Sequence, residues 1–328
     1  MSLFDPKNPR LKPRIAAGEP VGVVWLTLGL PTLAEIASRH GPDAVVVDMQ
    51  HGLFDRLSLE ATIAAATVPV LVRTRDDHPA SIGEALDAGA EGVIVPLVET
   101  AEAARQAARA CRYPPAGHRS GGGIRPLADF AAHIAHSSDG LVAAVMIETA
   151  AGVEAAAEIA DSGVDMVFIG TGDLALSLGT APGSEAHEAA CQTVLAACRK
   201  AGIPCGVFAM APEAAVARIA QGFALTVASI DIEAFESTTK AALATFRAGA
   251  TAPAAAKPVA AKPAAKKAAK PKAAAARPSV AKARASKTSA TASPEAKPAA
   301  RKSAAAGPKA DKPAAPKTTG ARSRRKPS

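Results

Sequence analysis

Short apolar runs alternate with longer alanine-rich amphipathic stretches from residue 20 to about residue 247. Uninterrupted apolar runs are typical of strands that are covered on both faces of a parallel sheet. The pattern therefore predicts eight strands, which lie at 21–28, 43–48, 68–73, 92–97, 141–148, 165–170, 203–208 and 223–229. Helical patterns occupy the segments between and after them, at 32–40, 57–66, 79–88, 100–111, 150–161, 185–201, 212–221 and 231–247.

Eight strand–helix units in about 230 residues favour a closed (β/α)8 TIM barrel. An open, doubly wound parallel sheet is the competing interpretation, because the number of strands alone does not distinguish the two. One connection exceeds the usual length, since residues 112–139 separate the fourth helix from the fifth strand and contain three consecutive glycines. Segments of this length inside a compact domain are commonly functional, so we expect a functional loop here.

The composition changes after residue 250. Residues 251–328 contain 20 Lys and Arg, two acidic residues, 11 prolines and no aromatic residue. The prolines interrupt any helix, and so little apolar bulk cannot form a core, so this segment is predicted to be disordered. The chain is thus divided into an N-terminal arm (1–19), a barrel domain (20–249) and a disordered tail rich in Lys, Ala and Pro (250–328).

Charge is divided along the same boundary. The tail carries a net charge of +18, whereas residues 1–250 hold 18 basic and 28 acidic residues, a net charge of −10. A tail of nearly one sign predicts non-specific binding to DNA, RNA or another polyanion. No secretory signal and no apolar run of membrane-spanning length is found, and the four cysteines form no CxxC pair. We therefore expect a cytoplasmic protein with no membrane partner, associated with the nucleoid if the tail binds DNA.

Four predicted strands end in ionisable residues. The second strand ends at Asp48 with His51 just beyond it, the third at Arg73 and the fifth at Glu148, and Asp173 follows the sixth in "GTGDLA". An acid after a strand is more often a helix cap than a catalyst. The carboxyl ends of barrel strands nevertheless meet on one rim, where active sites lie, so the whole set predicts an active site.

The two carboxylates Glu148 and Asp173 are hard oxygen donors with no cysteine beside them. This donor set suits Mg²⁺ or Mn²⁺, with Co²⁺ as a third candidate, and fits zinc poorly. Vacant positions on such an ion would accept a substrate that chelates through two oxygens, such as a 2-keto acid. The backbone N–H groups of "GTGD", around Gly172, would bind its carboxylate.

The remaining strand-end residues have roles that match such a substrate. Arg73 would neutralise charge on the keto oxygen as an enolate forms. His51, oriented by Asp48, would be the general acid–base group at neutral pH.

Other chemistries fit less well. A Schiff-base aldolase needs a lysine at the barrel mouth, and residues 1–250 contain none at a strand end. "GTGDLA" matches the dinucleotide fingerprint G-x-G-x-x-A, but glycines and a proline would interrupt the helix that should follow. His133 and His136 have the spacing of a helical metal site without an acidic partner, so they are expected to be surface histidines.

Six segments in this order resemble the HpcH/HpaI aldolases: "VVVDMQHG", "PVLVR", "LDAGAEGVIVPLVETAEAA", "RYPPAGHRSGG", "MIETAAGVE" and "VFIGTGDLALSLG". These are class II, metal-dependent pyruvate aldolases, including hydroxy-ketoheptanedioate and 2-keto-3-deoxy sugar-acid aldolases. The resemblance covers about residues 15–240. It implies a barrel of the phosphoenolpyruvate/pyruvate superfamily, assembled as a hexamer of swapped dimers. It also implies reversible cleavage of a 2-keto-4-hydroxy acid to pyruvate and an aldehyde.

The resemblance also assigns roles to individual residues. It implies that Glu148 and Asp173 are the metal ligands, and that His51, paired with Asp48, is the acid–base group. Arg73 would stabilise the enolate, the backbone at Gly172 and Asp173 would hold the pyruvate carboxylate, and Arg119 would lie in a substrate-side loop.

The chain departs from the family at Gln50, where compared members have an acid, and at Met146, where they have a glutamine near the metal. Two other functions remain open. A citrate-lyase-β-like acyl-CoA lyase would share the two carboxylates, although its typical N-terminal segment is absent. A nucleic-acid-associated protein would use the barrel as an oligomeric scaffold for its basic tails, which resemble those of linker histones.

Overall fold

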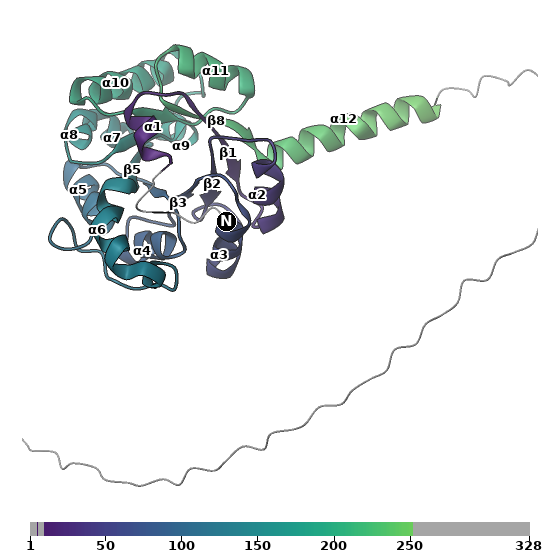
Figure 1. Cartoon of the computed structure of the whole chain (residues 1–328). Coiled ribbons are helices and arrows are strands. Elements are labelled where there is room, and N and C mark those ends of the chain that lie inside the picture. Colours follow the sequence, from purple (N-terminus) through teal and green to yellow (C-terminus); the bar gives the residue numbers. More distant parts are fainter. Residues whose placement is uncertain (1–4, 6–9, 252–328) are drawn as a thin grey trace, which may run out of the picture. The chain divides into compact units, whose positions relative to one another are not determined.

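The structure is a computed structural model that describes residue 5 and residues 10–251 (Figure 1). Eight parallel strands form a closed barrel in chain order, and the eighth pairs with the first. This confirms the predicted TIM barrel and excludes the open sheet. The predicted disordered tail lies outside the described residues. The strands are β1 (Val21–Leu26), β2 (Ala44–Asp48), β3 (Val70–Arg73), β4 (Gly92–Val95), β5 (Val142–Ile147), β6 (Met166–Ile169), β7 (Cys205–Val207) and β8 (Leu225–Ile230).

Helices surround the barrel (Figure 1). Several begin where a side chain caps the first backbone N–H groups, as in α3, where the side chain of Asp55 before the helix and that of Ser58 in its first turn bond each other's backbone N–H. The helices are α1 (Lys12–Ala16), α2 (Pro31–Ser38), α3 (Arg56–Ala65), α4 (Pro79–Asp87), α5 (Ala101–Ala110), α6 (Phe130–Gly140), α7 (Ala150–Glu154), α8 (Ala156–Ala160), α9 (Thr171–Ser177), α10 (Glu185–Ala201), α11 (Pro212–Ala220) and α12 (Asp231–Thr251), with a 3-10 turn η1 (Pro126–Asp129).

The alternation of side chains along each strand decides what enters the barrel. In β2, Ala44 and Val46 belong to the interior cluster, whereas Val45 and Val47 pack between the strands and the helices. Because successive side chains of a strand point to opposite faces, Asp48 continues the interior set. The same parity applies to other strands, and the large residues of the interior cluster include Trp25, Leu71, Ile94, Met146 and Phe168.

Helix α1, which the sequence pattern did not predict, lies at the amino-terminal end of the barrel. Leu11 and Ile15 are buried in the same cluster as the strand interior. The carboxylate of Glu91, one residue before β4, accepts hydrogen bonds from the backbone N–H groups of Arg10 and Leu11. These residues therefore close the amino-terminal end of the barrel, so an active site can form only at the carboxyl-terminal end.

The long connection 112–139 is only partly a loop. Its second half forms η1 and α6, and His133 on α6 is buried at 7% exposure. Burial lowers the pKa of His133 to about 4, and its ring packs edge-on against Tyr113. The expectation of a surface histidine is therefore wrong for His133, which is buried with its ring against Tyr113, whereas His136 is exposed.

Helix α12 closes the domain and then projects away from the barrel (Figure 1). The carboxylate of Asp231 accepts hydrogen bonds from the backbone N–H groups of Thr27 and Leu28, which ties the start of α12 to the end of β1. Further along the helix, Phe235 and Phe246 are about 70% exposed. Within the described part of the chain, no helix combines the length and the apolar character needed to cross a membrane.

Candidate active site

Asp48 and Arg73 are register partners at the carboxyl ends of β2 and β3. The Arg73 guanidinium donates from Nε to Oδ1 of Asp48 at 2.9 Å and from Nη2 to Oδ2. The third guanidinium nitrogen, Nη1, has no hydrogen-bond partner among the residues that the structure describes. Arg73 therefore offers a positive group with a free donor at the barrel mouth.

Trp25 supports this ion pair from β1. Its indole Nε1 donates to Oδ2 of Asp48 at 3.2 Å, and the Arg73 guanidinium carbon lies 5.2 Å from the centre of its ring. Burial by itself would raise the pKa of Asp48, but the hydrogen bonds and charge of Arg73 outweigh it and lower that pKa. Asp48 is therefore an anion that holds Arg73 in place.

The contact between Asp48 and His51 differs from the expectation. Oδ1 of Asp48 accepts the backbone N–H groups of Gln50 and His51, at 3.0 and 3.1 Å, and does not bond the imidazole. The prediction that Asp48 orients the ring is therefore wrong, because Arg73, Trp25 and two backbone groups occupy its oxygens. His51 itself is exposed in the loop after β2.

Glu148 follows β5 and is 1% exposed. Its Oε1 accepts the backbone N–H of Leu97 at 2.8 Å, whereas Oε2 is buried with no hydrogen-bond partner. Gly170, just after β6, makes room for this carboxylate, because a Cβ there would lie 2.5 Å from Oε2. An unpartnered buried carboxylate oxygen is costly unless a cation or proton satisfies it.

The pKa of Glu148 reflects this position. Burial raises it to about 7, and the Leu97 N–H and the charge of Arg73 act against the rise. The carboxylate of Asp173 adds to the rise through its charge and through a side-chain hydrogen bond, which two ionised carboxylates cannot form and which therefore needs a proton on one of them. Asp173 and Arg73 therefore both lie near enough to Glu148 to change its pKa. Among the described residues no cluster of three or more possible ligands occurs, so the site offers two carboxylates. Such a pair fits a hard cation that keeps most of its coordination sphere for water and substrate.

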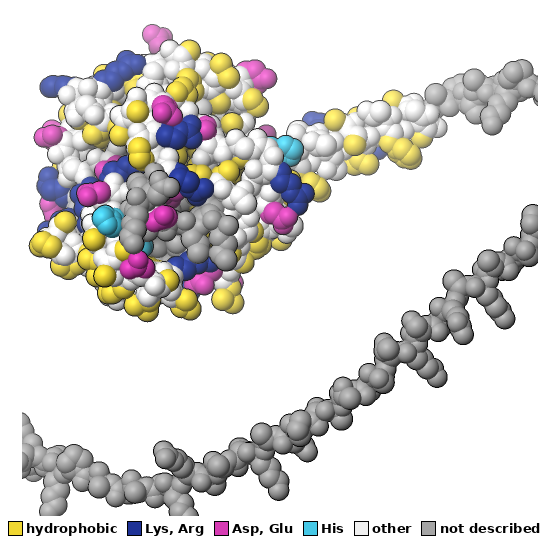
Figure 2. Space-filling view, in the orientation of Figure 1, with side chains coloured by type: hydrophobic (Ala, Val, Ile, Leu, Met, Phe, Trp, Pro, Cys, Tyr) yellow, Lys and Arg dark blue, Asp and Glu magenta, His cyan; other side chains and the backbone are white. Residues whose placement is uncertain are grey.

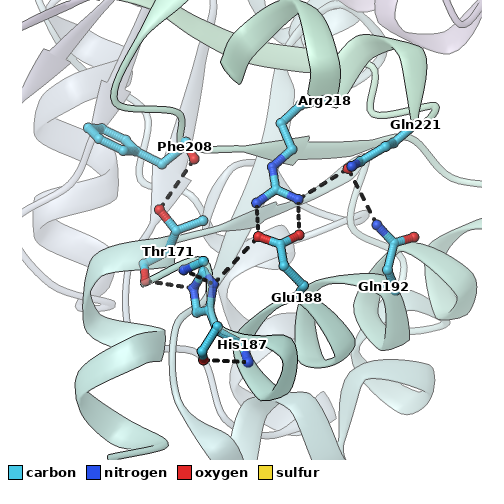
Figure 3. A network of polar contacts seen from close by, with 9 residues as sticks. Thr171, His187, Glu188, Gln192, Phe208, Arg218 and Gln221 are labelled. Atoms are coloured by element: carbon cyan, nitrogen blue, oxygen red, sulfur yellow. Dashed lines mark hydrogen bonds and ion pairs between the residues drawn. The ribbon is translucent and has the colours of Figure 1, made fainter. Parts of the chain in front are cut away.

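Asp173 and Gly172 lie in the first turn of α9. Space beside Gly172 is open, since nothing lies within 4 Å of a Cβ built there. The start of α9 is anchored by His187, which is buried on α10 (Figure 3). His187 Nδ1 accepts the backbone N–H of Gly183, so Nε2 carries the proton and donates to the Thr171 carbonyl at 3.0 Å.

The structure does not bring Arg119 to the other predicted site residues. Its guanidinium is 1% exposed and binds Asp87 at 2.7 Å. Asp87 ends α4 and precedes β4, so this ion pair lies at the amino-terminal end of the barrel. The face of the Arg119 guanidinium stacks on Tyr113, with its carbon 4.7 Å from the ring centre. Within this chain Arg119 therefore binds Asp87 and does not reach the other predicted site residues, and its assignment to a substrate-side loop stays a prediction.

Three contributors were missed in the sequence. Trp25 and Leu97 each hold a site residue through one hydrogen bond, and His187 bonds the carbonyl of Thr171, the residue before Gly172. Only the position of Trp25 at a strand end gave a signal, because Leu97 acts through its backbone and His187 lies in a distant helix. The described lysines Lys12, Lys200 and Lys240 lie on α1, α10 and α12, away from the carboxyl ends of the strands, and Lys12 pairs with Asp165 at the amino-terminal end of β6.

The profile described as HpcH/HpaI aldolase/citrate lyase matches residues 22–237. The hydroxypyruvate/pyruvate aldolase of Rhizorhabdus wittichii is 35% identical over 240 residues, which are 70% of this chain and 96% of that protein. The 2-keto-3-deoxy-L-rhamnonate aldolase of Escherichia coli K12 is 32% identical over 260 residues, 75% of this chain and 96% of that one.

Solved structures agree. An HpcH/HpaI aldolase/citrate lyase family protein from Burkholderia cenocepacia superposes with a TM-score of 0.69 at 33% identity, covering 73% of this chain and all of that one. An HpcH/HpaI aldolase from Desulfitobacterium hafniense gives a TM-score of 0.68 at 27% identity, covering 73% and 97%.

Proposed function

Since the chain belongs to the HpcH/HpaI aldolase/citrate lyase family and is a class II aldolase, a carbon–carbon lyase, we propose that it reversibly cleaves a 2-keto-4-hydroxy acid to pyruvate and an aldehyde. The observation that carries the proposal is the unpartnered Oε2 of Glu148, buried beside Asp173 and Arg73 at the carboxyl end of the barrel. An imine mechanism has no such support, because the described lysines lie away from this carboxylate.

Glu148 and Asp173 would hold a divalent cation, Mg²⁺ or Mn²⁺, with Co²⁺ as a third candidate. Two carboxylates and open space beside Gly172 match the few protein ligands that these ions take. When bound, the ion supplies Lewis-acid polarisation of the keto oxygen. The first N–H groups of α9, at Gly172 and Asp173, would receive the substrate carboxylate.

Arg73 would stabilise the negative charge that develops on the keto oxygen. Two of its nitrogens are fixed by Asp48, so the guanidinium is held before the substrate arrives. A donor that needs no reorganisation is worth more in the transition state than a mobile one. Asp48 therefore contributes by positioning Arg73.

His51 would act on the aldehyde half of the substrate. It takes the proton of the 4-hydroxyl group as the bond between C3 and C4 breaks. The bonding electrons pass to C3 and form the enolate, the carbonyl of the aldehyde forms at C4, and protonation of C3 then yields pyruvate. Exposure of His51 in the loop after β2 suits a group that exchanges protons with solvent.

The relatives named hydroxypyruvate/pyruvate aldolase and 2-keto-3-deoxy-L-rhamnonate aldolase guide the substrate panel. We would assay cleavage and condensation with pyruvate and hydroxypyruvate and a series of aldehydes, each with Mg²⁺, Mn²⁺ and Co²⁺. EDTA is expected to abolish cleavage and the cation to restore it. Full activity of the metal-free protein, or trapping of pyruvate on a lysine by borohydride, would contradict the proposal.

We further propose that the protein is a hexamer that packs α12 against another copy. The exposed apolar residues of α12 are spaced so that they share one face of the helix, and Figure 2 shows hydrophobic side chains along it. They are Ile232, Phe235, Leu243 and Phe246. Exposed apolar surface of this kind marks a protein–protein contact.

A second function is carried by the charge of residues 251–328. With 20 basic and two acidic residues, this segment would bind DNA, RNA or another polyanion without sequence preference and associate the cytoplasmic enzyme with the nucleoid. The proposed division is an arm (1–19), a catalytic barrel (20–249) and this tail (250–328). Binding to nucleic acid and catalysis would then be separable.

A further inference from the structure

Leu97 has an unusual backbone conformation. It lies two residues after the end of β4 with a φ of 57°, and no other non-glycine residue in the described ranges, 5 and 10–251, has a positive φ. L-residues with a Cβ seldom adopt this left-handed region, and leucine has no side-chain group that favours it. The surroundings must therefore hold Leu97 in this conformation.

Packing of the Leu97 side chain does not explain the conformation, since that residue is 56% exposed. The hydrogen bonds of the turn do. The N–H of Leu97 donates to Oε1 of Glu148 at 2.8 Å, and the N–H of Val98 donates to the carbonyl of Met146 at 3.1 Å. Val98 is buried at 1% exposure, which fixes the far side of the turn.

The contact determines which oxygen of Glu148 is available. Oε1 is occupied by Leu97, so the carboxylate presents Oε2, which has no hydrogen-bond partner and faces the space left by Gly170. If Leu97 adopted the usual negative φ, its N–H would no longer point at Oε1 of Glu148. Oε1 would then lose its donor, and the carboxylate would be free to rotate.

We propose that the left-handed turn at Leu97 is a positioning device for Glu148, which fixes the carboxylate so that Oε2 is the oxygen presented to a divalent cation. This inference rests on the proposed metal-dependent function. It concerns the backbone of Leu97 and predicts that the identity of its side chain matters only through the backbone conformation that it permits.

Substitutions at Leu97 separate backbone from side chain. Glycine and asparagine adopt positive φ readily, whereas β-branched valine does so rarely. Glycine also removes more of the side chain than valine does. If side-chain bulk mattered, Leu97→Gly would be the more harmful change. If the backbone matters, Leu97→Val would be.

The experiment is a titration of the full-length apoprotein with Mn²⁺, in which electron paramagnetic resonance measures the concentration of the free ion. Leu97→Gly and Leu97→Asn are expected to bind within about twofold of wild type. Leu97→Val is expected to bind about 10- to 100-fold more weakly, the range found when a group that orients a metal ligand is lost. If Leu97→Val does not fold, Leu97→Ala serves instead, because it also has a Cβ and should bind more weakly than Leu97→Gly.

Melting temperature of each apoprotein is the accompanying measurement, because a merely structural role would change stability and leave Mn²⁺ affinity unaltered. Equal Mn²⁺ affinity of the glycine and valine variants, with wild type binding normally, would overturn this inference and leave the proposed function standing. A wild-type protein that does not bind Mn²⁺, or a Glu148→Gln variant that binds as well as wild type, would overturn both.

Discussion

Arg73 donates two hydrogen bonds to the carboxylate of Asp48, its register partner on the neighbouring strand. Both side chains are nearly buried, at 11% and 2% exposure. A buried pair of this kind is weak evidence for stability but holds its members in a single geometry. At the mouth of a barrel, that geometry fixes the direction of a positive charge.

Replacing Arg73 by alanine should therefore lower turnover strongly. Loss of one fixed donor to a developing oxyanion typically costs about 10²- to 10³-fold in kcat. The variant also leaves Asp48 buried without its partner, so its free energy of unfolding should fall by about 3–5 kcal/mol. Steady-state kinetics with saturating Mn²⁺ and urea unfolding measure the two effects. Arg105→Ala removes an exposed arginine on α5 and is the control, and unchanged turnover of Arg73→Ala would refute the assigned role.

His51→Ala should separate two partial reactions. Cleavage of the aldol should fall much more than exchange of the pyruvate methyl protons with solvent, because only cleavage needs a base at the 4-hydroxyl group. Cleavage is followed by coupled detection of pyruvate and exchange by nuclear magnetic resonance in D₂O. The exposed His136 on α6 provides the control, His136→Ala. Equal losses in both reactions would assign His51 to the enolate side instead.

The barrel was predictable from the sequence because its strands are buried on both faces, which leaves an uninterrupted apolar run for each. The positions of Asp48, Arg73, Glu148 and Asp173 on one rim followed from the same strands. Partners of these side chains were not predictable in the same way. Asp48 accepts hydrogen bonds from five donor groups, and the pattern could not show that Arg73, Trp25 and the backbone would bind it in place of the His51 ring.

The error at His133 has a similar cause. His133 lies in a long connection that packs its own Tyr113 against the His133 ring and binds Asp87 of α4 through Arg119. Residue spacing in the sequence does not reveal which end of the barrel such a segment reaches. Leu97 acts through its main chain, so its residue type carries no signal at all.

Metal affinity should depend on pH through Glu148. Burial raises the pKa of Glu148 to about 7, and a cation must displace the proton that the apoprotein holds below this pH. The Mn²⁺ dissociation constant should therefore rise about tenfold for each unit of pH below 7 and change little above it. Calorimetric titration in two buffers of different ionisation enthalpy measures the proton released.

The same pKa shift makes the apoprotein less stable as pH rises, whereas it makes Mn²⁺ binding tighter. Because the folded-state pKa of Glu148 is raised, its favourable contribution to apoprotein stability is present at low pH. That contribution is lost as pH rises from about 4.5 through 7. Saturating Mn²⁺ should remove this loss. Glu91→Gln is the control for the metal-linked effect. Burial also raises the pKa of Glu91, so this variant should change the pH dependence of apoprotein stability but not the proton release on Mn²⁺ binding. Proton release identical at pH 6 and pH 8 would contradict the assignment to Glu148.

Charged residues on the apolar face of α12 should disrupt assembly. Phe235→Lys combined with Phe246→Lys places two charges where about 70% of each side chain is exposed in the single chain. Burying unpaired charges at a contact between copies is strongly unfavourable, so the hexamer should dissociate. Size-exclusion chromatography with light scattering gives the mass. Ala241→Lys adds a charge on the opposite side of the helix and should leave the mass unchanged, and a wild-type monomer would refute the proposed assembly.

Removal of the tail should separate catalysis from nucleic-acid binding. The full-length chain should bind duplex DNA without sequence preference, because its last 78 residues contain 20 basic and two acidic residues. Binding should come from counterion release, with log K falling by about 0.9 per phosphate neutralised for each unit of log salt. About six contacts would then cost about three orders of magnitude in affinity between about 50 and 200 mM salt. Lacking aromatic residues, the tail should not strongly prefer single strands, since it cannot stack on bases.

A chain that ends after Thr251, the last residue of α12, tests the division directly. Its net charge is that of the acidic body, so we expect DNA binding in gel shift to disappear while aldol cleavage persists at the full-length rate. If the protein is a hexamer, six tails act together, and full-length protein should bind DNA more tightly than an isolated tail peptide does. DNA binding by the truncated chain, or loss of its turnover while it remains folded, would show that the barrel and the tail do not work independently.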